Sequence, residues 1–323
     1  NKMATLKVAA SYLCRYLLRA FLIISRSFYL LCRKMYQLRL KWILSYYDIT
    51  TMKKFIRPLS RIIRNVFRAI RDLLSSKNRF VRINPFAKGR IAFFDKKNVK
   101  LFSLLSRGEG DSSVLDTIFP KYVYSLEGMM RSDDIYAHYN SILSSGKYPL
   151  IIDCGANIGA SAYFFSKEFP KSMVVGVELE LNNARLAKQN NANRDNVNIL
   201  HAAIGAESGT VIIDNPNEIN KDSFRAKTNR KPGKDSVKMI TISDIKRLYP
   251  EATPFIAKID IEGFEDELFS KNTKWMKEFY LITLEIHDWM LPRKSTSSNF
   301  FREHSKESRD CYLRGDMVFS IKS

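Results

Sequence analysis

The sequence predicts an α/β fold in which helices cover both faces of a mostly parallel sheet. Two observations support this prediction. Short apolar runs of strand length alternate with helix-like segments through the second half of the chain, which is the pattern of successive β-α-β units. Glycines and acidic residues directly follow several of these runs, at the strand ends where open parallel sheets bind their ligands.

Basic residues are concentrated near the beginning of the 323-residue chain. The net charge is +20, and residues 1–100 hold 24 of the 53 Lys and Arg but only 3 of the 33 Asp and Glu. The rest of the chain is therefore nearly neutral, so the overall charge says little about its chemistry. We predict a basic amphipathic helical leader (1–85), lead-in strands and helices (86–145) and a cofactor-binding domain (146–323).

The leader is predicted to lie on a surface rather than to span a membrane. Arg15, Arg19, Arg26 and Arg33 interrupt its apolar residues between Leu13 and Leu44, whereas a spanning helix needs about 20 mostly apolar residues. Five further arginines recur at steps of four and three, which places them on one helix face: Arg57, Arg61, Arg64, Arg68 and Arg71. Such a face suits an anionic membrane surface. Packing on the main domain and nucleic-acid binding are the alternatives.

The four cysteines indicate a reducing environment. None stands in a C-x-x-C pair or beside a histidine, which argues against a structural zinc site and a disulfide scaffold. The sequence therefore predicts a cytoplasmic protein, peripheral at a membrane surface if the leader binds lipid.

The lead-in is predicted to contain two short strands, over residues 90–94 and 99–105, followed by a turn at 107–111. A helical segment then runs from Val114 to Tyr139, with breaks at Pro120 and Gly128.

A glycine-rich turn follows the first strand of the main domain, which runs from Tyr148 to Asp153. Gly155 and Gly159 flank Asn157 in this turn and leave room for a ligand beside the backbone. The helix predicted over residues 162–169 then offers free N–H groups at its N-terminus. We therefore expect a cofactor at this point.

The second strand, residues 172–177, ends at Glu178 and Leu179. An acid in this place can accept hydrogen bonds from a ribose diol. The carboxylate of Asp153, before the glycine turn, would repel a phosphate but suits the ammonium of a methionine group. The pattern thus predicts S-adenosylmethionine rather than a dinucleotide or ATP, and there is no P-loop motif.

The later strands complete the predicted sheet. The third, residues 197–200, ends at His201 and Ala202, which we expect beside the adenine. A strand pair at 210–213 and 237–242 flanks a polar loop, 215–235, that could act as a lid. The fourth strand (255–259) and the fifth (280–285) lead to the reaction site, and a helix at 296–308 precedes two antiparallel edge strands around Gly315.

Methyl transfer to a hydroxyl needs in-line geometry and a group that accepts the proton. His287, which follows the fifth strand, has a suitable pKa, and Asp260, which ends the fourth, is the rival base. Glu262 completes the predicted catalytic set. His287 could instead simply cap a strand, and Glu262 could be an acid favoured at a helix start. We predict no metal, although Asp260, Glu262 and Glu285 could hold a divalent cation.

Taken together, the motifs resemble those of the FkbM family of methyltransferases over residues 91–321. They are Ile152–Gly159, Val177–Glu178, Ala202–Gly205, Thr241–Ile245, Ala257–Glu265 and Leu284–His287. The sequence departs from the family pattern at Leu179, where proline is common, and at Ser243, which replaces an acid. The resemblance implies a class I methyltransferase (Rossmann-like) fold, S-adenosylmethionine as donor and O-methylation of a glycan or small molecule.

Two other functions stay open. The basic arm could serve an RNA or DNA methyltransferase, but the fourth strand ends in Asp260-Ile-Glu-Gly instead of the [DNS]-P-P-[YFW] pattern that such amino-methylating enzymes resemble, so nucleic acid is an unfavoured partner. A membrane-bound protein with a vestigial cofactor fold is the non-enzymatic alternative. The intact glycine turn and Glu178 argue against it.

Overall fold

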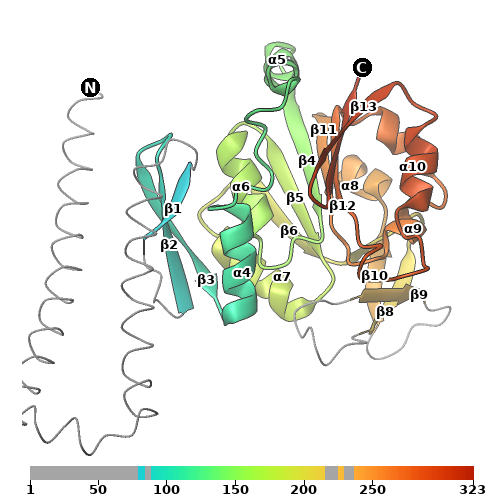
Figure 1. Cartoon of the computed structure of the whole chain (residues 1–323), viewed down its shortest axis with the longest axis horizontal. Helices are drawn as coiled ribbons and strands as arrows, with labels where there is room; N and C mark the ends of the chain where they lie inside the picture. The colour runs from blue at the N-terminus through green and yellow to red at the C-terminus, as the bar shows by residue number, and fades with distance from the viewer. Residues whose placement is uncertain (1–78, 84–88, 215–224, 229–235) are drawn as a thin grey trace, which may run out of the picture. The chain divides into compact units, whose positions relative to one another are not determined.

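The computed structural model describes residues 79–83, 89–214, 225–228 and 236–323 (Figure 1). Nearly all of the predicted leader, with its five arginines, and most of the predicted lid lie outside the described residues. The described residues divide between two compact units, one within 1–87 and 91–103, the other formed by 88–90 and 104–323. The domain boundaries predicted at residues 85 and 145 remain predictions. Within the described ranges, no helix has the length and apolar character needed to cross a bilayer.

The described part of the small unit includes most of a three-stranded sheet of order β1-β2-β3. Its strands are β1 (Phe80–Arg82), β2 (Gly89–Asp95) and β3 (Lys100–Ser106), which confirms the two strands predicted here. The aromatic rings of Phe80 and Phe93 are fully buried in it. Arg79 and Asp95, both buried, form an ion pair of 3.0 Å beside the paired ends of β1 and β2.

The larger unit contains a seven-stranded sheet of order β13-β14-β12-β11-β4-β5-β6 (Figure 1). The strands are β4 (Tyr148–Cys154), β5 (Met173–Glu178), β6 (Val197–His201), β11 (Ala252–Ile259), β12 (Leu281–Glu285), β13 (Arg309–Arg314) and β14 (Met317–Lys322). Strand β14 is antiparallel to both β12 and β13, and all the other neighbouring strands pair in parallel. The topology confirms the predicted class I methyltransferase (Rossmann-like) fold.

The direction in which the chain adds strands changes between β4 and β11. From β4 the chain continues to β5 and β6 on one side, whereas β11 and β12 lie on the other. The carboxyl ends of β4 and β11 therefore flank a topological switch point, where open α/β sheets bind their ligands. The inner strands are almost entirely apolar and buried, as strands covered on both faces must be.

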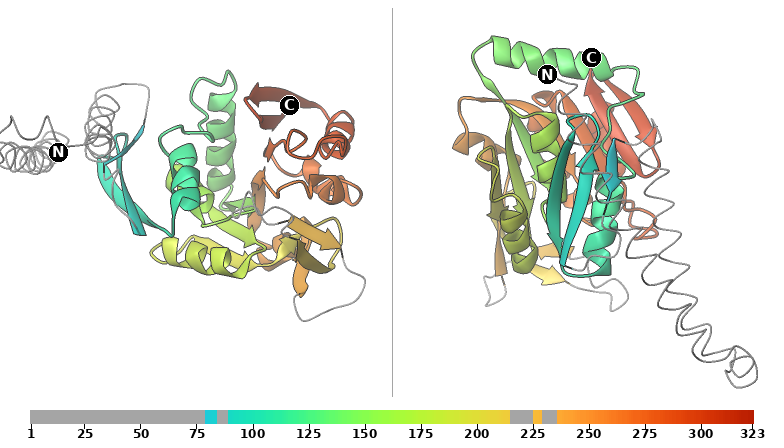
Figure 2. Two further views of the ribbon diagram at one scale, coloured as in Figure 1. Left: turned by 60° about the horizontal axis from the view of Figure 1, so that its bottom comes forward. Right: turned by 90° about the vertical axis from the view of Figure 1, so that its left-hand side faces the viewer.

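Helices cover both faces of this sheet (Figures 1 and 2). Apolar residues of α8 (Ile242–Leu248), α9 (Glu265–Leu268), η1 (Thr273–Lys277) and α10 (Ser298–His304) join the core cluster on one face. On the other face, α6 (Ala160–Glu168) contacts β4, β5 and β6, while α4 (Glu109–Ile118) contacts α6. The remaining helices are α5 (Ser132–Ser144), which contacts β4, and α7 (Leu181–Asn190), which contacts β5 and β6.

A second sheet of order β7-β10-β8-β9 follows β6. It comprises β7 (Ala203–Ile204), β8 (Gly209–Asp214), β9 (Arg225–Thr228) and β10 (Ser236–Ile240). The predicted pair of β8 and β10 is confirmed, and it is antiparallel. Two details of the prediction are wrong. Strand β9 lies inside the segment predicted as one loop, and β10 ends at Ile240 because Thr241 and Asp244 form a capping box that starts α8.

The helical segment predicted over residues 114–139, with breaks at Pro120 and Gly128, contains two separate helices, and both predicted breaks lie between them. Helix α4 begins at Glu109, inside the predicted turn, where the Asp111 carboxylate in its first turn binds the Arg107 side chain and backbone N–H. It ends before Pro120, which has no N–H group to continue the helical hydrogen bonds. Helix α5 starts only at Ser132. Helix α7 was not predicted, and α10 is shorter than the predicted 296–308.

One buried cation ties the antiparallel edge to the rest of the sheet. The guanidinium of Arg309 on β13 donates hydrogen bonds to the Ser320 hydroxyl and to the carbonyl oxygens of Met276, Phe279, Tyr280 and Ser320. These carbonyls belong to η1, to the segment before β12 and to β14. A single side chain thus satisfies buried backbone acceptors in three places.

We expect Arg309→Leu to lower the free energy of unfolding by about 2–4 kcal/mol, because several buried carbonyls would lose charged donors. Urea denaturation measures this change. Arg302→Leu is the control, since the Arg302 side chain on α10 is 55% exposed and its loss should change stability by less than about 0.5 kcal/mol. Equal stability of the two variants would show that the hydrogen bonds of Arg309 do not stabilise the fold.

Candidate functional site

A pocket lies at the carboxyl ends of β4, β5 and β11, at the switch point of the sheet. Five residues predicted to bind a cofactor line it: Gly155, Asn157, Glu178, Leu179 and Ala202. The predicted catalytic residues Asp260 and Glu262 line it as well. The structure thus brings residues from four predicted motifs to one place. Asp153, Gly159, His201 and His287 are outside the lining.

The glycine turn after β4 is shaped by close contacts within the protein. Gly155, Asn157 and Gly159 all have positive φ, at 79°, 47° and 78°, a region that favours glycine and tolerates asparagine. A Cβ atom on Gly155 would lie 1.7 Å from the carbonyl oxygen of Asp260. One on Gly159 would lie 2.5 Å from the Asn191 side-chain nitrogen. These glycines therefore let the turn pack against the end of β11 and against α7.

Glu178 is buried at the end of β5 and holds the turn through its carboxylate. Its Oε2 accepts a hydrogen bond from the backbone N–H of Asn157 at 2.7 Å, and its Oε1 accepts one from the backbone N–H of Glu180 at 2.8 Å. Burial raises the pKa of Glu178 to about 7 in spite of these hydrogen bonds, which lower it. Each carboxylate oxygen keeps a second lone pair, so a ligand diol can also bind here.

Asn183 is a pocket residue whose role the sequence did not reveal, because α7 was not predicted. The carboxylate of Glu180 caps the first turn of α7 by accepting from the Asn183 N–H. The Asn183 side chain lines the pocket, and its Oδ1 accepts a hydrogen bond of 2.6 Å from Arg107. Arg107 is held in turn by Asp111 at 2.9 Å. Residues of the lead-in thereby support the pocket wall.

The far wall of the pocket is apolar. Leu179 and Phe264 line it, and both pack against a small cluster of buried residues from the second sheet, Ala203, Val211, Val237 and Met239. Ala202 is buried in the lining, but His201 is exposed and its ring lies 3.0 Å from the carbonyl oxygen of Leu179. The wall can therefore accept a flat apolar ring beside Ala202. A contact with His201 stays a prediction.

Asp153 and Lys258 form a buried ion pair beneath the pocket. The two residues face each other in the register of β4 and β11, and Lys258 Nζ lies 3.0 Å from Asp153 Oδ1. The Ser161 hydroxyl donates to the other carboxylate oxygen at 2.6 Å. Burial lowers the pKa of Lys258, but the charge and hydrogen bond of Asp153 together with the charges of Tyr124 and Asp260 outweigh it and hold the pKa above its usual value. The Asp153 side chain is fully enclosed.

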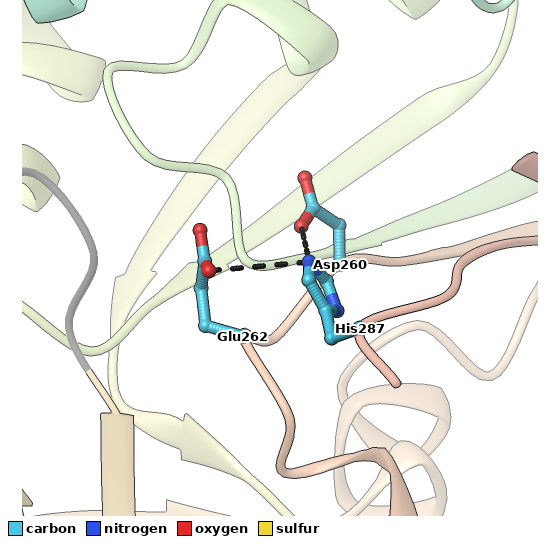
Figure 3. A group of neighbouring side chains, drawn as sticks. All are labelled: Asp260, Glu262 and His287. Carbon is cyan, nitrogen blue, oxygen red and sulfur yellow. Dashed lines mark ion pairs between the residues drawn. The ribbon is translucent and has the colours of Figure 1, made fainter. Parts of the chain in front are cut away.

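The three residues predicted as catalytic lie together beyond this pair (Figure 3). His287 follows β12 and is buried, and its Nε2 lies 3.5 Å from Asp260 Oδ1 and 3.9 Å from Glu262 Oε2. A third carboxylate oxygen, on Glu285, lies 3.8 Å from the same nitrogen. On the other side of the ring, Nδ1 lies 2.8 Å from Glu265 Oε1.

The acidic surroundings control the protonation of this group. Burial lowers the pKa of His287, but the hydrogen bond and charge of Glu265 and the charges of Asp260 and Glu262 outweigh it and raise the pKa to about 9. Burial, reinforced by the charge of Asp260, raises the pKa of Glu285 to about 8. The group therefore retains protons near neutral pH. It could also hold a divalent cation, because Asp260, Glu262 and His287 each offer one ligand atom within 4.8 Å of the others.

Glu265 is a second site residue that sequence reasoning missed. It is the first residue of α9 and is fully buried, which is unusual for an acid at a helix start. Its position three residues after Glu262, inside the Ala257–Glu265 motif, is the signal that could have identified it.

The sequence of residues 153–311 matches the methyltransferase FkbM domain. No curated protein matches the chain significantly. Three solved structures illustrate the similar folds. A protein of Staphylococcus aureus, provisionally described as a caffeoyl-CoA O-methyltransferase, is 12% identical over 66% of this chain and 98% of its own, with a TM-score of 0.35. The METTL16 methyltransferase domain is 10% identical over 69% and 83%, with a TM-score of 0.36.

A methyltransferase of Geobacter sulfurreducens is 10% identical over 68% of this chain and 93% of its own, with a TM-score of 0.33. Similarities this weak support no inference about reaction or substrate. The family assignment rests on the sequence of residues 153–311.

We expect Lys258→Met to lower the free energy of unfolding by about 3–5 kcal/mol, because it leaves the Asp153 carboxylate buried without a counter-ion. The double variant Asp153→Asn/Lys258→Met should recover a large part of this loss, since no buried charge is then unpaired. Urea denaturation of both single variants and the double variant tests this coupling. Strictly additive losses would show that the two side chains do not stabilise each other.

Proposed function

The chain belongs to the FkbM methyltransferase family through residues 153–311, and we propose that it transfers the methyl group of S-adenosylmethionine to a hydroxyl oxygen of a glycan or small molecule. One observation supports this proposal above all others. Asp260 and Glu262 line the pocket at the switch point and also face His287. A cofactor pocket and a group able to accept a proton therefore share a border.

The pocket offers complementary groups to each part of the cofactor. Glu178 can accept hydrogen bonds from the ribose diol, and the wall formed by Leu179, Ala202 and Phe264 suits the adenine ring. Asn157 and the two glycines shape the turn between them. Asp153 was predicted to bind the methionine ammonium. Because its carboxylate is enclosed with Lys258 and Ser161, we propose that it supports the turn from beneath.

The reaction is a direct displacement at the methyl carbon. The acceptor oxygen forms a bond to that carbon while the bond from carbon to sulfur breaks, and S-adenosylhomocysteine leaves. The hydroxyl proton passes to His287 Nε2, while Asp260 and Glu262 orient the hydroxyl. Asp260 remains the rival proton acceptor. Neutral imidazole is required for this role, so the raised pKa of His287 places the greatest activity at alkaline pH.

We expect Glu178→Gln to weaken S-adenosylmethionine binding by about 10- to 100-fold, which corresponds to the loss of one or two charge-assisted hydrogen bonds. In the parent protein the affinity should rise as pH increases through about 7, because the ionised carboxylate is the better acceptor. The variant should lose this pH dependence. Calorimetry between pH 6 and 8 measures both effects, with the exposed Glu251→Gln as control. Unchanged affinity in Glu178→Gln would remove the pocket assignment.

We expect His287→Ala to lower turnover by about 10²- to 10⁴-fold, the usual contribution of general base catalysis, while cofactor affinity changes little. A transfer assay with labelled methyl groups, screened against glycans, small-molecule alcohols, lipids and RNA, supplies the acceptor. Turnover of the parent protein should persist in EDTA, because His287 takes the proton without a cation. Normal turnover of His287→Ala would eliminate it as base, and preferred transfer to RNA would favour the nucleic-acid alternative.

A further inference from the structure

We infer that Glu265 is the positioning residue of the proton acceptor: it binds Nδ1 of His287 and thereby directs Nε2 toward Asp260 and Glu262. The inference rests on the proposed function, since it assigns a partner to the proposed base. No reacting atom needs to touch Glu265.

The carboxylate of Glu265 connects the ring to the turn that carries the two acids. Its Oε1 lies 2.8 Å from His287 Nδ1 and also accepts a hydrogen bond of 3.2 Å from the backbone N–H of Ile261. Ile261 stands between Asp260 and Glu262. One oxygen atom therefore fixes the imidazole and the backbone of that turn relative to each other, although they come from different strands of the sheet.

The same contact determines the tautomer of the ring. An ionised carboxylate has no hydrogen to donate, so the Nδ1 that it binds must carry the proton. In neutral His287 the lone pair is then on Nε2, the atom that faces the pocket side. Among the described residues this nitrogen lies 3.5–3.9 Å from oxygens of Asp260, Glu262 and Glu285. The arrangement of acid, imidazole and acceptor follows the logic of catalytic triads.

The burial of Glu265 supports a specific role for its contact with His287 Nδ1. The side chain is 2% exposed, and its second oxygen, Oε2, has no hydrogen-bond partner among the described residues. Burying a partly unsatisfied carboxylate is unfavourable. An acid at a helix N-terminus interacts favourably with the helix dipole even when it is exposed to solvent, so the dipole does not account for the burial of Glu265. The neighbouring Asp266 on α9 is exposed, as an acid without such a role is expected to be.

The charges that face His287 come from every element around it. Asp260 and Glu262 follow β11, Glu285 belongs to β12, and Lys258 lies behind Asp260 at 3.3 Å. Glu265 is the nearest of the acids and binds the opposite edge of the ring. Its negative charge favours the imidazolium that forms when the hydroxyl proton arrives, as the raised pKa of His287 reflects.

The test compares Glu265→Gln with Asp266→Asn in the full chain. The two variants remove the same charge from adjacent residues of α9, but only the first touches His287. For Glu265→Gln we expect the turnover number to fall about 10- to 100-fold, with KM and cofactor affinity within about threefold of the parent values. The rising limb of the pH profile and the pKa of the His287 ring, followed by NMR, should both move to lower pH. Asp266→Asn should change none of these.

An unchanged His287 pKa and an unchanged pH profile in Glu265→Gln would overturn the inference, even if activity fell, because a purely structural role lowers activity without moving either. If Glu265→Gln does not fold, Glu265→Asp decides the question. Its shorter side chain withdraws the carboxylate from Nδ1, so a ring pKa equal to that of the parent would likewise overturn the inference. The ring titration needs no acceptor, and so it remains decisive if His287→Ala retains turnover and the proposed base is abandoned.

Discussion

The buried pair of Asp153 and Lys258 is the interaction on which the rest of the site depends. It joins β4 to β11 at the switch point, and both turns that form the site begin within two residues of it. Lys258 also donates to the Gly155 carbonyl at 2.7 Å and lies 3.3 Å from Asp260. Buried ion pairs add little net stability because their desolvation is costly. The contribution of this pair is to hold the two turns in one geometry.

A second constraint follows from the first, because the two turns are packed backbone against backbone. Any side chain at Gly155 would collide with the Asp260 carbonyl, which lies only 1.7 Å from the ideal Cβ position. The cofactor turn and the acidic turn therefore cannot move independently. The pocket and the group around His287 share Asp260 and Glu262 for this reason.

The elements that could be predicted from sequence are those with strong local signals. The inner strands are continuous apolar runs, and the turn after β4 is marked by glycines at positions that require positive φ. Helix α7 lacked such a signal, because it is largely polar and Glu180 is an uncommon N-cap. The end of α4 was expected from Pro120, whereas its start at Glu109, inside the predicted turn, was not. The tertiary contact of Arg107 with Asp111 and Asn183 helps to place the start of α4.

The sequence by itself predicted the fold class, the family resemblance and the pocket residues at the ends of β4, β5 and β11, since apolar strand runs and the residues that follow them are local features. Only the tertiary structure decided the partners of the charged groups. Asp153 was read as a ligand contact but is enclosed with Lys258, and His287 is held by Glu265, a residue that no local pattern connects to it. These pairs join separate motifs, and strand register and burial bring them together. Strand register and burial cannot be read from the local sequence.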